Sequence, residues 1–319
     1  MKPHTSPRAA VAGTLTLALL GLGTTAAAAE DPPRVDDPPD ATAALVAKVA
    51  PGDRHVVDVE ARGGVARASS AAGTTTVPLD GGAAVVLESR DAAVPRLEVN
   101  LPENLALRDG AVADDGTVVF RSYDGGADVA VQSLDDGSAR VQTITSSPEG
   151  PHEFTYTFGD DIVLSPNGDG TIELLAPLDG GGAISRGTID RPWAADATGR
   201  PVDTHYTVVG DSLVQTVRPD AETTYPVVAD PRVERGFGTT TIRFTKKETR
   251  RLRDGATAGL ISAWLPFPAG AIIATASYLV RRQAKSAAAQ GKCVKIVVYG
   301  WPPSTFTWWP HTYSGGYCK

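Results

Sequence analysis

Short runs of alternating apolar and polar residues fill the middle of the chain, from about residue 55 to residue 228. Asp-Gly or Asn-Gly pairs such as Asp136-Gly137 separate these runs at short intervals. An alternation of period two places apolar side chains on one face of a strand, and Asp-Gly accepts the positive φ angles of a tight hairpin turn. Because no long amphipathic helix interrupts the series, the pattern predicts an antiparallel meander that forms a sandwich or an open barrel. The predicted strands are 74–79, 83–87, 117–120, 129–132, 141–144, 154–158, 171–175, 206–209 and 213–217.

The pattern changes after residue 231, where helical periodicity replaces the alternation. Thr245 and Glu248 have the spacing of a capping box, in which each side chain satisfies an amide at the start of a helix. Pro266 and Pro268 end that helix, because a proline ring removes a backbone donor and clashes with the preceding turn. We therefore expect a mainly β domain followed by a small α+β domain with a helical hairpin. The predicted elements are a strand at 239–244, helices at 246–265 and 269–290, a strand at 292–299 and an aromatic loop at 300–319.

The first 54 residues form two segments that differ in composition from the rest of the chain. Residues 1–29 begin with Lys2 and Arg8, continue with an apolar run too short to span a bilayer, and end in four alanines. This order is typical of a secretory signal peptide, so we expect export through a cleaved Sec-type signal. Residues 30–54 contain two Pro-Pro pairs among acidic residues, which predicts an extended linker with one or two helical turns at 42–49. The predicted domains are a signal peptide at 1–29, a linker at 30–54, a β domain at 55–231 and an α+β domain at 235–319.

Charge is divided unequally between two parts of the chain. Residues 30–234, the acidic body, contain 35 acidic and 15 basic residues. Residues 235–319, the basic tail, contain 13 Lys or Arg and only two acids, Glu248 and Asp254. The formal net charge of −7 therefore combines +2 in residues 1–29, −20 in the body and +11 in the tail. Such an asymmetry indicates anionic partners for the tail and predicts a contact between the tail and the body.

Cys293 and Cys318 are the only cysteines, and both lie in the basic tail. Exported proteins reach an oxidising environment, in which such a pair forms a disulfide. We therefore expect one disulfide that closes the last part of the chain.

Two stretches near the end of the body carry a resemblance to known proteins. They are residues 192–199 (PWAADATG) and residues 224–231 (TYPVVADP), with the strand at 214–217 between them. These stretches resemble the β-rich module of uncharacterised actinobacterial secreted proteins, and they are similar to modules of exported RHS-type and polymorphic-toxin-like proteins that precede a variable C-terminal region. The resemblance covers roughly residues 110–231 and implies a carrier or scaffold role without catalytic residues. The Tyr-Asp repeats of RHS shells are absent, so no encapsulating cage is implied.

Residue patterns for catalysis or metal binding are scarce. The four histidines outside the signal peptide lie far apart, and no nucleotide-binding, esterase or metalloprotease motif occurs. Residues 165–176 match a calcium loop in part, but Ala176 occupies the position of its bidentate glutamate, so a hairpin turn is the better interpretation. We predict no enzyme activity, no metal and no cofactor.

Residues 256–280 form an apolar stretch about long enough to span a bilayer. A Pro-Phe-Pro sequence interrupts the stretch and basic residues flank both of its ends. A permanent anchor would also leave Cys293 and Cys318 in the reducing cytoplasm. A packed helical hairpin is therefore the favoured interpretation, with membrane insertion on contact and a constitutive anchor as alternatives.

Seven of the 20 aromatic residues lie within residues 299–317. Such rings can pack in the core of a small domain, stack on sugars or lie at a membrane interface. Trp308 and Trp309 are adjacent and cannot easily both face inward, so we expect some exposed aromatic surface.

Together these patterns favour a secreted protein in which an acidic β carrier domain precedes a cationic domain that acts at the cell envelope, in the manner of a toxin or bacteriocin. Its partners would be anionic lipid or wall polymer, and no nucleic acid is expected. A non-lytic wall-glycan-binding or structural envelope protein is the alternative. A metal-free ribonuclease built on His311 with Lys292 and Lys295 is a third hypothesis, which lacks a second acid or base. The predicted envelope-binding residues are Lys246, Lys247, Arg250, Arg251, Arg281, Arg282, Trp301, Trp308, Trp309 and Tyr313.

Overall fold

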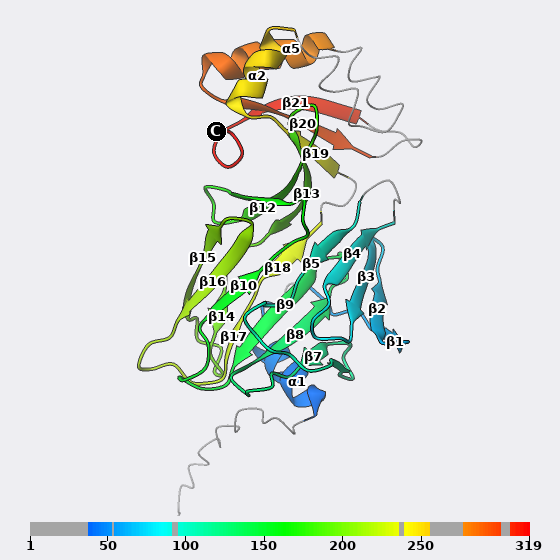
Figure 1. Cartoon of the computed structure of the whole chain (residues 1–319), viewed down its shortest axis with the longest axis vertical. Coiled ribbons are helices and arrows are strands. Elements are labelled where there is room, and N and C mark those ends of the chain that lie inside the picture. The colour runs from blue at the N-terminus through cyan, green and yellow to red at the C-terminus, as the bar shows by residue number, and fades with distance from the viewer. Residues whose placement is uncertain (1–37, 53, 91–94, 236–238, 256–276, 301–306) are drawn as a thin grey trace, which may run out of the picture. The chain divides into compact units, whose positions relative to one another are not determined.

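The computed structural model describes residues 38–52, 54–90, 95–235, 239–255, 277–300 and 307–319. The fold is mainly β, with antiparallel sheets and a small α+β region at the C-terminal end, which confirms the predicted fold class (Figure 1). The helices are α1 (Pro39–Val49), α2 (Lys246–Arg253) and α5 (Ser277–Ala289). The strands are β1 (Glu60–Arg62), β2 (Val65–Ser69), β3 (Gly73–Pro78), β4 (Val85–Ser89), β5 (Leu97–Val99), β6 (Ala111–Val112), β7 (Val118–Phe120), β8 (Ala127–Ser133), β9 (Ala139–Thr145), β10 (Glu153–Tyr156), β11 (Val163–Pro166), β12 (Ile172–Pro177), β13 (Ala183–Ile189), β14 (Ala194–Ala195), β15 (Asp203–Val209), β16 (Ser212–Arg218), β17 (Val227–Ala229), β18 (Arg232–Glu234), β19 (Thr239–Arg243), β20 (Cys293–Tyr299) and β21 (Thr307–Tyr313).

Antiparallel pairing arranges the described strands in three sheets. One sheet has the order β1-β2-β3-β4-β5, and a second has the order β10-β16-β15. In the third, the main path runs β21-β20-β19-β13-β18-β9-β8-β7-β6. Strands of the basic tail therefore continue a sheet of the acidic body.

Turns with Asp-Gly lie between neighbouring strands, as the sequence predicts. Asp136-Gly137 joins β8 to β9, and Gly137 has a φ of 81° that a residue with a Cβ rarely adopts. The partial calcium-loop sequence forms the turn between β11 and β12, where the Asn167 amide donates to the Thr171 carbonyl at 2.8 Å. The predicted hairpin turn is therefore confirmed.

Helix α1 covers part of the body's main sheet. Its Val46 is fully buried and packs against Ala130 of β8, Ile144 of β9 and Val228 of β17. Strands β8 and β9 are consequently buried along their whole length, because side chains on both of their faces find apolar neighbours. The helical turns predicted at 42–49 are confirmed and belong to the longer helix α1, whose buried side chains add to the core.

The two stretches that carry the resemblance lie side by side. Strand β14 pairs with β17, which places Trp193 beside Asp230. The Trp193 amide donates to Asp230 Oδ1 at 3.0 Å, and the Tyr206 hydroxyl donates to the same oxygen at 3.1 Å. Burial raises the pKa of the Asp230 carboxyl to about 7, and the neighbouring Asp190 adds to the effect. These residues form a buried polar contact between strands of the body.

The basic tail differs from its prediction in two places. Helix α2 ends at Arg253, and Gly255 has a φ of 104°, so no continuous helix extends from residue 246 to residue 265. Residues 256–276, including the predicted helix break, lie outside the described residues. The predicted aromatic loop contains strand β21, which lies at the edge of its sheet. An edge strand tolerates Pro310, because it needs backbone donors on only one side.

Candidate functional site

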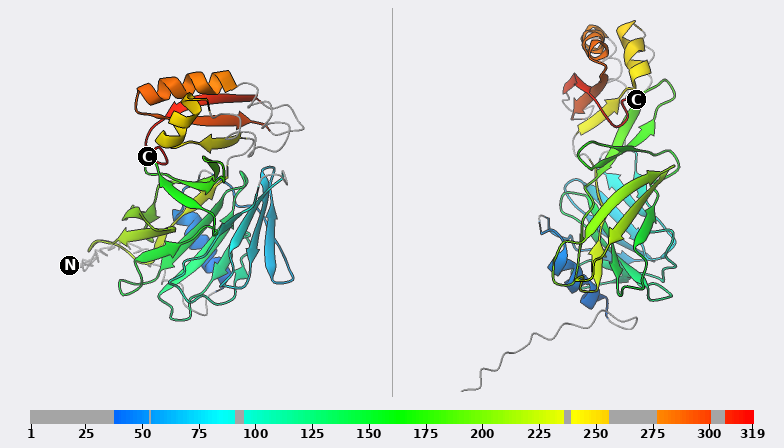
Figure 2. Two further views of the ribbon diagram at one scale, coloured as in Figure 1. Left: turned by 45° about the horizontal axis from the view of Figure 1, so that its top comes forward. Right: turned by 90° about the vertical axis from the view of Figure 1, so that its left-hand side faces the viewer.

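The candidate site is the three-stranded part of the sheet that belongs to the basic tail, with its two helices. Strands β19 and β20 are paired, and β21 pairs with the other edge of β20. Helices α2 and α5 lie together over one face of these strands (Figures 1 and 2). Alternate side chains of the strands therefore face the helices, and the remainder face away from them. The side chains that form the core with the helices are Ile242, Phe244, Val294, Ile296 and Val298.

Helix α2 starts at the predicted capping box. The Thr245 hydroxyl accepts from the Glu248 amide at 3.3 Å, and the Glu248 carboxylate accepts from the Thr245 amide at 2.8 Å. One turn later, the Thr249 hydroxyl accepts from the Val294 amide of β20 at 3.1 Å. These bonds fix the start of α2 on the sheet and leave its basic residues outside the core.

The outer surface of the two helices is strongly basic. Leu252 of α2 and Val280, Ala284 and Ala287 of α5 are fully buried in the tail's core. Of the two acids, Asp254 is paired with Arg253 at 2.7 Å and Glu248 is held by the cap. We call the remaining charged surface the helix layer. Its exposed basic residues are Lys246, Lys247, Arg250, Arg251, Arg281, Arg282 and Lys285.

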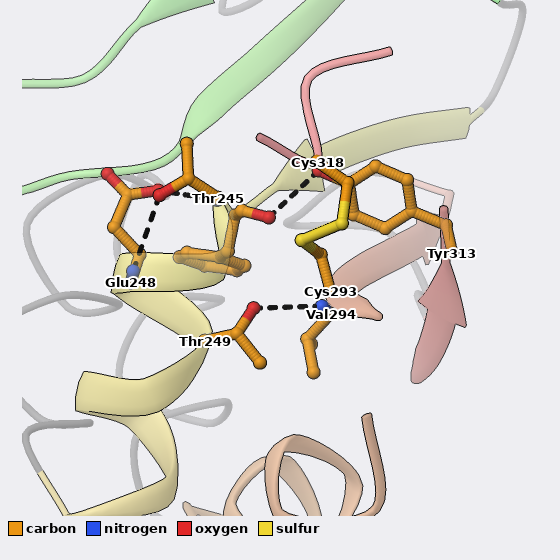
Figure 3. The surroundings of a disulfide bond; sticks show 8 residues. Thr245, Glu248, Thr249, Cys293, Val294, Tyr313 and Cys318 are labelled. Atoms are coloured by element: carbon orange, nitrogen blue, oxygen red, sulfur yellow. Dashed lines mark hydrogen bonds between the residues drawn. A yellow bond between two sulfur atoms is a disulfide. The ribbon is translucent and has the colours of Figure 1, made fainter. Parts of the chain in front are cut away.

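The predicted disulfide between Cys293 and Cys318 is confirmed, with an S–S distance of 2.03 Å (Figure 3). Cys293 begins β20 and is fully buried, while Cys318 lies in the turn after β21. Near this bond, the Tyr313 hydroxyl donates to the Phe244 carbonyl at 2.8 Å. The end of the chain is thus fastened to the strand that precedes α2.

The face of β19–β21 that points away from the helices is called the open face. Three basic residues lie in one row across the three strands, with Arg243 opposite Lys295 and Lys295 opposite His311. We call these three residues the basic row. Neighbouring strands are about 4.8 Å apart, so the row is about 10 Å long. His311 is exposed, and Lys295 and Arg243 are partly exposed. The sheet register therefore brings three basic side chains together from distant parts of the sequence.

Aromatic rings lie next to this row on the open face. Trp309 is opposite Val297, and its side chain is 55% exposed. Tyr299, which is 45% exposed, is the diagonal neighbour of Trp309. Diagonal neighbours in an antiparallel pair are about 7–8 Å apart. The two rings thus form a small exposed aromatic surface beside the basic row.

Electrostatic contacts order one end of the basic row. Arg243 forms an ion pair with Glu173 of β12, and its guanidinium carbon lies 4.9 Å from the centre of the Tyr313 ring. Burial lowers the pKa of Lys295, and the charge of Arg243 lowers it further, while Glu173 opposes both effects. Burial raises the pKa of Tyr313. Arg243 is thereby held in place, whereas Lys295 and His311 remain beside the exposed rings.

The predicted envelope-binding residues divide between the two faces. The cations of α2 and α5 lie on the helix layer, whereas Trp309 and Tyr313 lie on the open face. Trp308 lies opposite Val298 and packs against the core under the helices. Trp301 lies outside the described residues. The adjacent tryptophans therefore face opposite sides, as expected from their positions in one strand.

Sequence reasoning did not identify Arg243 or Glu173 as parts of a site, and it included Tyr299 only in the general cluster of aromatic residues at 299–317. The alternation within 239–243 and 293–299 indicates which residues share a face, but the partner strands and their register come only from the fold. Of the residues in the ribonuclease hypothesis, Lys295 lies opposite His311, while Lys292 precedes the strand.

Across the described ranges, no group of three or more His, Cys, Asp or Glu residues is placed to hold a metal ion. No described helix has the length and apolar character needed to cross a bilayer. A comparison with the models of known protein families finds no match, and a comparison with curated proteins finds none either.

Proposed function

We propose that this is an exported protein in which the acidic body carries a cationic tail that acts at the cell envelope, in the manner of a toxin or bacteriocin. The supporting observation is the helix layer, where seven Lys and Arg residues are exposed on two adjacent helices. Cations near an anionic membrane surface contribute about 1 kcal/mol each. The helix layer has the charge needed to bind anionic lipid or an anionic wall polymer.

Export is supported by two features of the chain. Residues 1–29 have the charge and apolar pattern of a cleaved signal peptide. The disulfide between Cys293 and Cys318 suits an oxidising environment outside the cytoplasm.

Binding by the helix layer rests on charge rather than on insertion of its apolar residues. Leu252, Val280 and Ala284 are fully buried between the helices and the sheet, so they are already used for folding. Tyr278 is 70% exposed on α5 and is available at an interface. We therefore expect the helix layer to bind at the surface of an anionic target without inserting into it.

The acidic body supports the tail in this proposal. Ala183 and Ile184 of β13 pair with Arg243 and Ile242 of β19. The Gly182 amide also donates to Glu248 Oε1 at 2.8 Å. Together with the ion pair between Arg243 and Glu173, these contacts would hold the tail to the body.

Vesicle binding by the full mature chain tests the proposal. Changing Lys246, Lys247, Arg250 and Arg251 together to Gln should weaken binding to anionic vesicles at least tenfold at low salt. Binding to neutral vesicles should be weak for every variant. The matched control changes four exposed arginines of the body to Gln: Arg62, Arg67, Arg96 and Arg218. If this control weakens binding equally, only the net charge of the protein matters. If the protein binds neither anionic vesicles nor purified wall, the proposal is refuted.

A non-lytic wall-glycan-binding module is the second candidate function. The exposure of Trp309 supports it, since an exposed indole can stack on a sugar ring. Retention on purified wall that persists at high salt and is lost in Trp309→Ala would favour this candidate over the helix layer.

A further inference from the structure

The open face has a property that envelope binding by the helix layer does not use. Exposed rings of Trp309 and Tyr299 lie beside a row of basic side chains on the sheet face that points away from the helices, where Val297 is buried. Lys295 and His311 belong to that row, and His311 is directly opposite Lys295. The face thus combines flat π surfaces with positive charge within a few residues.

No acidic residue occurs in β19, β20 or β21. The carboxylate of Glu173, which comes from the body, is paired with Arg243 at one end of the basic row. Lys295 and His311 are therefore not neutralised by an acid of their own strands. The open face is complementary to an anionic partner.

The distance between an aromatic ring and a basic side chain on the open face suits an anionic polymer in which every repeating unit carries a flat ring. Trp309 and His311 are two residues apart on β21, which is about 7 Å along a strand. Val297 and Thr241 share the row of Trp309 and leave its ring without a large neighbour across the sheet. A ligand that crosses the strands therefore meets a ring and a cation side by side.

We infer that the open face binds single-stranded nucleic acid, a partner that the sequence patterns alone did not lead us to expect. Each nucleotide supplies a phosphate charge and a base with an exposed π face, and proteins bind such strands by combining basic grooves with aromatic stacking. Trp309 and Tyr299 stack on bases, and Lys295 and His311 contact phosphates. Arg243 keeps its ion pair with Glu173 and does not contact the ligand, so it fixes the end of the basic row next to Lys295.

Other occupants use fewer of these residues. A neutral glycan stacks on Trp309 but leaves the basic row without a partner. The bases of a duplex are paired and stacked on each other, so their faces are not available to Trp309. This inference goes beyond the envelope proposal and does not depend on it, because it uses the opposite face of the sheet.

The test measures fluorescence anisotropy of a labelled oligo(U) of about 12 nucleotides with the full mature chain, its disulfide intact. Two or three phosphate contacts predict a slope of log K against log salt of about −1.4 to −2. Trp309→Ala should weaken binding about 5- to 160-fold, which corresponds to the loss of one stacked base. Lys295→Gln should make the slope less steep by about 0.7.

Trp308→Phe is the matched control, because it changes the neighbouring indole on the helix side and keeps a ring in the core. This variant should bind oligo(U) like the original chain. Circular dichroism and thiol titration confirm that each variant is folded and disulfide-bonded. Trp309→Ala should also weaken oligo(U) binding when Lys246, Lys247, Arg250 and Arg251 are changed to Gln. The helix layer and the open face are thus tested by different variants, so failure of the envelope proposal and failure of this inference are distinguishable.

Several outcomes overturn the inference. They are equal binding of a duplex of the same length, no effect of Trp309→Ala, and stronger competition by a polyol-phosphate wall polymer than by oligo(U). The last result would assign the open face to the envelope polymer instead of to nucleic acid.

Discussion

Basic residues have different roles in the acidic body and in the basic tail. In the body, Arg232 has a side chain that is only 8% exposed, and it contacts Asp136, Asp190 and Glu234. Arg121 and Asp128 form a similar, largely buried pair. In the tail, seven basic residues of the helix layer are exposed. The comparison shows that net charge predicts a partner only where the fold leaves the charges at the surface.

The largest expected loss of stability follows the removal of a buried cation from the body. Arg232→Met leaves several carboxylates without their shared cation, so we expect the free energy of unfolding to fall by about 3–5 kcal/mol. Arg218→Met, at an exposed pair with Asp203 whose atoms are 3.7 Å apart, should cost less than about 1 kcal/mol. Urea unfolding of both variants gives the comparison. Equal losses would mean that burial does not distinguish the two arginines.

Asp230 should make the stability of the body depend on pH. Its folded-state pKa of about 7 lies above its ordinary value of 3.8, so folding favours the protonated carboxyl. This contribution is fully present below pH 3.8 and is lost as the pH rises to about 7, and it amounts to about 4 kcal/mol.

Asp230→Asn should abolish most of that decline between about pH 4 and pH 7, because the amide does not titrate. Asp211→Asn, in an exposed turn, is the control and should leave the pH profile unchanged. Denaturant midpoints across this pH range provide the measurement. An unchanged profile in Asp230→Asn would contradict the raised pKa.

The disulfide should stabilise the tail and leave the body unaffected. The chain-entropy model assigns about 3.5 kcal/mol to a loop of this length, because Cys293 and Cys318 have a sequence separation of 25. The core of the tail is separate from the main core of the body, so the double change to Ala should act locally. Hydrogen exchange should become faster in α2 and β20 but not in β8 and β9. A similar increase in both regions would show that body and tail unfold together.

The smallest effect concerns the start of α2. Thr245→Ala removes the hydroxyl that accepts from the Glu248 amide, which should cost about 1 kcal/mol. Thr239→Ala, at an exposed position of β19, is the control. If amide exchange in α2 responds equally to both changes, the capping box does not stabilise this helix.

Local patterns in the sequence predict much of the body. Alternation of period two and Asp-Gly turns identify β3, β4, β8 and β9, because both signals depend on residues close together in the chain. The capping box at Thr245 is predicted for the same reason, since its donors and acceptors are three residues apart. The burial of the helix at Pro39–Val49 is not predicted, because only contacts with Ala130 and Ile144 show that its apolar side chains lie in the core.

The sequence by itself determined the strand-rich body, the division of charge and the pairing of Cys293 with Cys318, since composition and short-range spacing carry that information. Tertiary structure alone decided that Trp308 packs inward while Trp309 is exposed, and that Arg243, Lys295 and His311 share one row. The physical reason is strand register. A shift of one residue between β20 and β21 would exchange the two faces, and no local pattern specifies which residues of distant strands lie opposite each other.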